Sequence, residues 1–251
     1  MGSFQRSLGR TLAFLALCVA GAIIITSCKF PWQHTTTVTA SNLGAQPTAQ
    51  QVISTMQKNF HSVTAFHVNM KVENLGTASE GSIQIRNADG DVLMPDRVKA
   101  QATVLLSGQV VTIELISIAS TQYITDPITG QWRVVTGILN ASTLTNPDTG
   151  IISLASKLSG LSKPVNDSVN SVPCWRVNGQ LDASYLAFLT GGGLPAGTML
   201  ATSVCAGVAD GLPYQLIVTG RAAKSDTAQT VRTFTISNFN ENVTITAPQI
   251  Q

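Results

Sequence analysis

The chain has 251 residues, of which only 11% are charged, and its formal net charge at pH 7 is +2. This low, nearly balanced charge offers no basic patch, so nucleic acid is excluded as a partner. The composition is rich in Thr, Ser, Val and Gly and poor in Glu and Lys, which favours a β-rich fold. From residue 28 onward the chain is long enough for one substantial domain but too short for two.

The N-terminus is typical of a secretory signal peptide. Arg6 and Arg10 precede an apolar run from Leu12 to Ile25, and no acidic residue interrupts them. The run is shorter than the roughly twenty residues that a membrane-spanning helix needs. A positive start, a short apolar stretch and small residues before a cut site indicate a segment that is removed on export.

The cut site resembles the bacterial lipobox, in which an aliphatic residue and two small residues precede a cysteine. Ile25-Thr26-Ser27-Cys28 has this pattern. In such signals the cysteine thiol receives a diacylglyceryl group and becomes the first residue, so the resemblance implies that Cys28 is the lipid attachment site. Two or more acyl chains hold a protein stably on a membrane. The alternative is a cysteine within a retained anchor.

The segment after Cys28 contains mainly Thr, Ser, Gln and Pro and has almost no charge or apolar periodicity. Such a segment cannot bury enough surface to fold, so it reads as a tether. We therefore expect three parts: residues 1–27 as a lipoprotein signal peptide, 28–47 as the lipidated N-terminus and tether, and 48–251 as the folded domain. The location expected is the extracytoplasmic side of the cell membrane.

The folded part begins with a predicted helix. Thr48 and Gln51 have the spacing of a capping box. One apolar stripe follows, made of Val52, Ile53, Met56, Phe60 and Val63. From residue 66 the period changes to two, so Phe66, Val68, Met70 and Val72 face one side and His67 faces the other, as in a half-buried strand.

More strands and two further helices are expected downstream. The strands are "GSIQIRN", "DRVKAQATVLLSG", "QVVTIELISIASTQYIT", "QWRVV", "CWRVNGQL" and four runs near the C-terminus. In "NADGDV", Asp89 and Asp91 are a weak calcium-loop candidate, and Asp-Gly more often forms a turn. A second helix is expected in "NPDTGIISLASKLSGL", capped by Asn146 with Pro147 at its first position, and a short one follows Asp182.

The sheet should be antiparallel and apolar on one face, because neighbouring strands are joined by short turns and several alternate cleanly. Three helices are few for so broad an apolar face. The sheet must therefore either close over its own core or leave an apolar hollow that holds a ligand. Composition leaves these two outcomes equally open.

Two cysteines, Cys174 and Cys205, lie in the folded part. An even pair in an exported protein favours a disulfide, with two buried free thiols as the alternative. The sequence has neither of two common catalytic motifs: the histidines His34, His61 and His67 lack HExxH spacing, and no G-x-S-x-G motif occurs. The run "TGGGLPA", from Thr190 to Ala196, is a loop, and a candidate gate, rather than a dinucleotide site, because Pro195 stands where the phosphate-binding helix should begin. We expect no enzyme activity, no metal and no cofactor.

The order of elements resembles the mycobacterial LppX/LprA/LprF/LprG lipoproteins. The similarity runs from about Thr48 to Pro248, and its sharpest local match is "NPDTG", Asn146 to Gly150. The resemblance implies an α+β fold, a highly curved antiparallel half-barrel with helices on its concave side enclosing an apolar cavity, similar to LolA. The Cys174 and Cys205 pair is not expected of the family in general, and suggests a divergent member.

The resemblance also implies a function, namely binding multi-acyl lipids or glycolipids and helping to carry them across the envelope. The partners expected are the lipid, the membrane through acylated Cys28 and a membrane exporter, for a protein that is itself monomeric. A surface-anchored protein-interaction module with a closed core is the alternative. Candidate cavity-lining residues come from the apolar strand faces: Phe66, Val68, Met70, Ile83, Ile85, Val111, Ile113 and Leu115.

Overall fold

The computed structural model describes most of the folded domain. It covers residues 46–77, 83–106, 108–137, 139–146, 148–190 and 194–250, without the side chains of Ile83, Phe188 and Leu189. The predicted signal peptide, Cys28 and the predicted tether up to residue 45 lie outside the described residues, as do Pro147 and the glycines 191–193 of the candidate gate. Within the described part, no helix is long and apolar enough to cross a membrane.

The structure is a large β-sheet with short helical segments. The helices are α1 (Ala49–Phe60), α2 (Ala141–Thr145) and α3 (Ala187–Thr190), with 3-10 helices η1 (Ile151–Lys157) and η2 (Ala183–Leu186). The strands are β1 (Ala65–Leu75), β2 (Ile83–Leu93), β3 (Arg97–Leu106), β4 (Gln109–Ile118), β5 (Thr121–Thr125), β6 (Trp132–Val135), β7 (Val165–Val169), β8 (Val172–Asp182), β9 (Met199–Gly207), β10 (Pro213–Thr219) and β11 (Asp226–Ser237).

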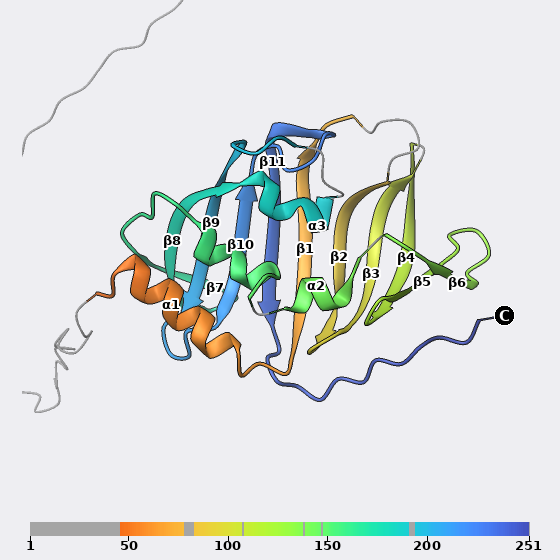
Figure 1. Ribbon diagram of the computed structural model, residues 1–251, viewed down its shortest axis with the longest axis horizontal. Coiled ribbons are helices and arrows are strands. Elements are labelled where there is room, and N and C mark those ends of the chain that lie inside the picture. The colour runs from red at the N-terminus through yellow and green to blue at the C-terminus, as the bar shows by residue number, and fades with distance from the viewer. Residues whose placement is uncertain are drawn as a thin grey trace, which may run out of the picture. The chain divides into compact units, whose positions relative to one another are not determined.

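All strands belong to one antiparallel sheet of order β6-β5-β4-β3-β2-β1-β11-β10-β9-β8-β7. Two meanders, β1 to β6 and β7 to β11, run outward from the centre, and the pairing of β1 with β11 joins them. The sheet is open and curved, and the helices lie in front of it in the view of Figure 1. The predicted curved antiparallel sheet with helices on one face is confirmed.

The first helix forms where its capping residues predict it. The Thr48 hydroxyl accepts a hydrogen bond from the backbone N–H of Gln51, and the Gln51 side chain accepts one from the N–H of Thr48. These two bonds satisfy donors that the first helical turn leaves unpaired. The stripe of Val52, Ile53, Met56 and Phe60 is buried as expected.

The second predicted helix starts later than expected. Asn146 ends α2, and its side-chain oxygen accepts hydrogen bonds from the N–H groups of Asp148 and Thr149, so it stabilises a turn instead of a helix start. The helical segment that follows is the 3-10 helix η1, which begins at Ile151. In both places a side-chain oxygen accepts hydrogen bonds from backbone N–H groups two or three residues later. At Thr48 a helix follows, whereas at Asn146 only a turn follows.

The "NADGDV" segment is part of strand β2, so the expected turn at Asp89-Gly90 is wrong. Gly90 pairs with Val68 and Ala100. A Cβ at this position would lie 2.3 Å from the Lys99 carbonyl oxygen and 2.6 Å from the Ala100 Cα. The glycine is therefore needed for the close approach of β3 and not for a turn.

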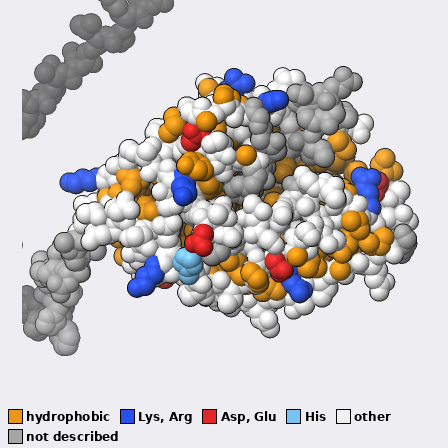
Figure 2. All heavy atoms as spheres, viewed as in Figure 1, with side chains coloured by type: hydrophobic (Ala, Val, Ile, Leu, Met, Phe, Trp, Pro, Cys, Tyr) orange, Lys and Arg blue, Asp and Glu red, His pale blue; other side chains and the backbone are white. Residues whose placement is uncertain are grey.

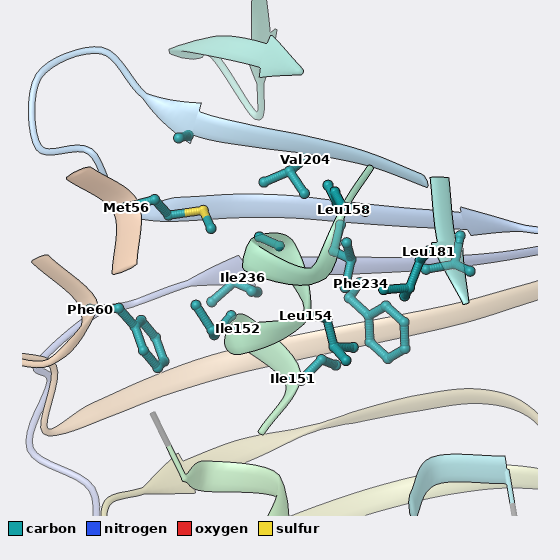
Figure 3. Packing of buried hydrophobic residues seen from close by; sticks show 14 of the residues in the cluster. Met56, Phe60, Ile151, Ile152, Leu154, Leu158, Leu181, Val204, Phe234 and Ile236 are labelled. Carbon is teal, nitrogen blue, oxygen red and sulfur yellow. The ribbon is translucent and has the colours of Figure 1, made fainter. Parts of the chain in front are cut away.

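The main hydrophobic core lies between α1, η1 and the sheet. Figure 3 shows Met56 and Phe60 of α1 and Ile152 and Leu154 of η1 pointing toward strand residues such as Ile236. Phe60 also packs edge-on against Phe66, with ring centroids 5.5 Å apart. A second, smaller cluster contains Val169 and the disulfide Cys174–Cys205, which confirms the predicted pairing.

Candidate functional site

The strand register defines which side chains share the helix-covered face, called here the inner face. In antiparallel pairs, directly opposed residues point to the same side of the sheet. Phe66, which lies in the core beneath α1, is opposed by Val92, and the same alternation continues outward to β4. By this register the seven predicted lining residues whose side chains are described belong to the inner face: Phe66, Val68, Met70, Ile85, Val111, Ile113 and Leu115.

One part of the inner face, formed by β8 to β11 and called here the packed half, is filled. Eight of its inward apolar side chains are at most 5% exposed: Val177, Leu181, Leu200, Val204, Leu216, Val218, Phe234 and Ile236. The helix α1 contacts β8 and β9, and η1 contacts β8 and α1. Dense packing of this kind leaves no room for a ligand without displacing the helices.

The other part, formed by β1 to β5 and called here the open half, is covered less completely. Val68, Met70, Ile85, Val111 and Ile113 are only half-buried. Val104, Leu115 and Ile124 are buried but do not belong to the main cluster beneath α1 and η1. Figure 2 shows few charged side chains on this side of the molecule. The open half is thus an apolar surface with accessible side chains, which is what a lipid chain would contact.

The helix α2 and the residues before it, Leu139–Thr145, lie over part of the open half and are called here the covering segment. The helix contacts β3 and β4. Polar groups hold the segment: the Ser117 hydroxyl donates to the carbonyl of Leu139 at 3.1 Å and accepts from the N–H of Ala141 at 3.2 Å. The Gln122 side chain accepts from the N–H of Leu139 at 3.0 Å.

The opposite end of the covering segment is also tied by a hydroxyl. Thr145, which is 2% exposed, donates to the carbonyl of Pro95 or to that of Ala141. Ser117, Gln122 and Thr145 were not among the predicted site residues. Ser117 carried a signal that could have been found, because it continues the alternation of Val111, Ile113 and Leu115 and so places a hydroxyl on an apolar face.

The structure places the predicted lining residues together but does not show a cavity over them. Ile113 lines a pocket of about 300 Å³ beside Trp132, together with Thr112 and Glu114 from the other side of β4. Another pocket of about 300 Å³ is formed around Asn178 and Ser203. A pocket of about 700 Å³ lies at the far end of the packed half, around Tyr214 and Phe239. The lining of a lipid cavity therefore remains a prediction for all eight candidate residues.

The described histidines have separate carboxylate partners. His61 lies 3.9 Å from Asp148. On the outer face, His67 Nδ1 lies 2.8 Å from Asp91 and Nε2 lies 3.2 Å from Asp89. Burial lowers the pKa of His67, but hydrogen bonds to Asp91 and Asp89 and their charges outweigh it, so this pKa lies above 6.5.

The pKa of Asp89 is correspondingly lowered, chiefly by the hydrogen bond that Asn69 donates to it, with a further contribution from His67. Among the described residues, no group of three or more His, Cys, Asp and Glu side chains could hold a metal ion. His67 therefore lies on the face opposite the apolar residues, as the strand pattern predicted, and is an ion-pair partner there.

Comparisons with known proteins give a consistent result. The family model described as LppX_LprAFG lipoprotein matches residues 48–245. The crystal structure of LprF from Mycobacterium bovis is similar with a TM-score of 0.64 at 19% identity, covering 80% of this chain and 96% of LprF. LppX from Mycobacterium tuberculosis is similar with a TM-score of 0.56 at 16% identity, covering 79% of this chain and 98% of LppX. No curated protein sequence matches the chain.

Proposed function

Because the chain belongs to the LppX_LprAFG lipoprotein family, whose members are lipid-binding carriers of the cell envelope, we propose that it is a membrane-anchored protein that carries multi-acyl lipids or glycolipids across the envelope. The observation that carries this proposal is the open half of the inner face. Val68, Met70, Ile85, Val111 and Ile113 form an accessible apolar surface there, next to a part of the same face that is fully packed.

Acyl chains would bind this surface through the removal of apolar area from water, which contributes about 25 cal/mol per Å². Such binding needs no catalytic group and no metal. It does need a cover that can open, because a carrier has to release its cargo. The covering segment is the candidate for this role, since it is short and is held by the apolar contacts of Leu139, Ala141 and Leu144 and by a few hydrogen bonds that involve Ser117, Gln122 and Thr145.

The anchor in this proposal is acylated Cys28, supported by the lipobox pattern before it. Replacing Cys28 with Ala in the full-length chain should abolish acylation and move the protein out of the membrane fraction. The measurement is fractionation combined with the mass of the intact protein. Continued lipidation of the variant would end the claim that Cys28 is the attachment site.

The cargo is tested by native mass spectrometry of the chain from Lys29 onward, expressed in a host that makes envelope lipids. We expect an added mass that disappears under denaturing conditions and is recovered as a multi-acyl lipid in organic solvent. A clean apo mass in a stably folded protein would instead favour the interaction module with a closed core.

The position of the cargo is tested with two neighbouring valines. Both valines lie in β4: Val111 is half-buried on the inner face, whereas Val110 is 56% exposed on the outer face. Val111→Trp should reduce lipid loading by filling the space that the acyl chains use, and Val110→Trp should leave it unchanged. Equal lipid loading of both variants would show that Val111 is not part of the binding surface.

A further inference from the structure

A second pocket lies outside the open half of the inner face. It has a volume of about 700 Å³, within the range of small-molecule sites. It is formed by the turn between β7 and β8, the turn between β9 and β10 and the chain that follows β11. The β9–β10 turn is tied to the first helix, because the Asn59 side chain donates a hydrogen bond to the Asp210 carbonyl at 2.7 Å. The end of β11 and α1 lie at the same end of the sheet (Figure 1).

Three asparagines line this pocket from separate segments of the chain. Asn170, Asn238 and Asn240 have φ values of 48°, 52° and 61°, a conformation that asparagine tolerates better than most residues. Within the described part of the chain, the side chains of Asn170 and Asn238 make no hydrogen bond to another residue. Each side-chain amide can both donate and accept, so two amides remain available to a ligand.

Two aromatic rings form the apolar part of the same pocket. Tyr214 and Phe239 pack edge to face, with centroids 5.4 Å apart and ring planes at 80°. The Tyr214 hydroxyl donates to the Asp210 carboxylate at 2.7 Å, and the other carboxylate oxygen accepts from the N–H of Leu212 at 2.9 Å. Burial and this hydrogen bond raise the pKa of Tyr214 to about 12, so the phenol remains a donor at neutral pH.

The charge of the lining excludes strongly charged ligands. Asp210 is the one charged side chain in the described lining, and both of its oxygens are already hydrogen-bonded. No Lys or Arg of the described residues lines the pocket, so an anion would find no cation there. The groups that remain are neutral amides and aromatic rings.

Two residues that line the pocket, Tyr214 and Asp210, are supported by residues outside it. Tyr214 packs against the small cluster of Val169 and the disulfide Cys174–Cys205. Gly207 leaves room for the Asp210 carboxylate, since a Cβ there would lie 2.2 Å from its Oδ1. Tyr214 and Asp210 are therefore held in place by packing and hydrogen bonds, which lowers the entropy cost of binding at this wall, whereas Asn170 and Asn238 are exposed.

We propose that this pocket binds a neutral saccharide. Sugar hydroxyls both donate and accept hydrogen bonds, which matches the free amides of Asn170 and Asn238. The C–H face of a sugar ring is apolar and can pack on the rings of Tyr214 and Phe239. This site shares no lining residue with the acyl-chain surface on the open half, and it gives the disulfide a positioning role.

The test uses substitutions that preserve the backbone. Glycine adopts positive φ without strain, so Asn170→Gly and Asn238→Gly remove the amides and keep the turns. The matched control is Asn74→Gly, because Asn74 also has a positive φ, 56°. Asn74 lies far from the pocket, near the end of β1, whereas the start of β1 adjoins the pocket: the Ala65 carbonyl accepts a hydrogen bond from the N–H of Asn240.

Binding is measured by calorimetry and saturation-transfer NMR with neutral oligosaccharides of glucose, mannose, galactose and arabinose at up to millimolar concentration. We expect one of these series to bind, with affinity reduced about fivefold by each Asn→Gly change in the pocket and unchanged in Asn74→Gly. Absence of binding to all four series, or equal losses in Asn74→Gly, would overturn the proposal.

The sugar could reach the pocket as free glycan or as the head group of a bound lipid. The Val111→Trp variant separates these sources. If the sugar is a head group, the intact glycolipid binds more tightly than its released oligosaccharide, and Val111→Trp removes the difference. If the ligand is a free glycan, the two bind equally and Val111→Trp has no effect. Loss of lipid loading with retained sugar binding would therefore separate this site from the proposed carrier function.

Discussion

The two halves of the inner face differ in how their cover is attached. In the packed half, α1 and η1 contribute Met56, Phe60 and Leu154 to a continuous apolar cluster. In the open half, the covering segment adds only Ala141 to this cluster, with Leu139 and Leu144 packed against it, and the hydroxyls of Ser117 and Thr145 also tie it to the sheet. Apolar packing is lost only when many contacts break together, whereas a hydrogen bond can be exchanged for a bond to water at little net cost. We therefore expect the packed half to supply more of the stability and the open half to rearrange more readily.

Removing the disulfide should have the largest effect on the free energy of unfolding. It tests the comparison because the disulfide links β8 to β9 within the packed half only. It closes a separation of 31 residues, for which the chain-entropy relation gives about 3–4 kcal/mol. Replacing both Cys174 and Cys205 with Ala should lower the free energy of unfolding by about this amount in urea titrations. Lipid loading should remain at temperatures where the variant is folded.

A result in which the cysteine variant keeps its stability but loses lipid would reverse the assignment of roles to the two halves. The proper control is the wild-type chain under reducing conditions, which breaks the same bond without changing the side-chain volume.

A pair of valines measures the difference in packing directly. Val204 is 2% exposed in the packed half, and Val111 is half-buried in the open half. Val204→Ala should cost about 2 kcal/mol, because it removes buried methyl groups and leaves a cavity. Val111→Ala should cost less than about 1 kcal/mol. Equal losses in chemical denaturation would mean that both halves are packed alike and that no binding surface exists.

The covering segment gives a smaller and more local effect. Ser117→Ala removes the hydroxyl that bonds both Leu139 and Ala141, leaving two backbone groups to find other partners at a cost of about 1–2 kcal/mol. We expect faster hydrogen exchange in Leu139–Thr145, with α1 and η1 unchanged. Faster lipid uptake and release should accompany it.

If Ser117→Ala instead destabilised the whole domain without a local change in exchange, the segment would be part of the core and not a movable cover. Ser62→Ala is a suitable control, because this exposed hydroxyl donates to Asn59 at the end of α1 and lies on no strand.

Features set by local sequence were predicted correctly. The capping box of Thr48 and Gln51 needs only neighbours three residues apart, and the alternation of Phe66, Val68 and Met70 needs only one strand. The antiparallel order follows from short connections. These features are encoded within a few residues of each other, which is why the fold and the inner-face register could be anticipated.

Features set by distant contacts were missed. Gly90 looks like a turn residue until β3 is placed against it. Asn146 looks like a helix cap until α2 is seen to end there. The hydrogen bonds that hold the covering segment join Ser117 and Gln122 to Leu139, and no local sequence pattern connects these residues. The binding surface therefore depends on pairings that spacing alone does not contain.

The smallest effect concerns the outer face behind the open half. His67 in β1 lies between Asp89 and Asp91 of β2 and so links the first two strands of the open half. Because its pKa in the folded protein lies above 6.5, the bonds to both carboxylates stabilise the protonated ring. This stabilisation is fully present below pH 6.5 and is lost as the pH rises through the higher folded-state pKa.

His67→Gln should therefore lower the free energy of unfolding more below pH 6.5 than well above it. The Asp89 carboxylate does not change this sign, since its lowered pKa makes its own contribution disappear only at pH values below 3.8. The measurement is a series of urea titrations of wild type and variant across this range, with His61→Gln as the control, because His61 is exposed and lies 3.9 Å from its carboxylate. A difference between wild type and His67→Gln that grew with pH would show that the ring is held neutral. The two carboxylates would then not act as the ion pair that joins β1 to β2.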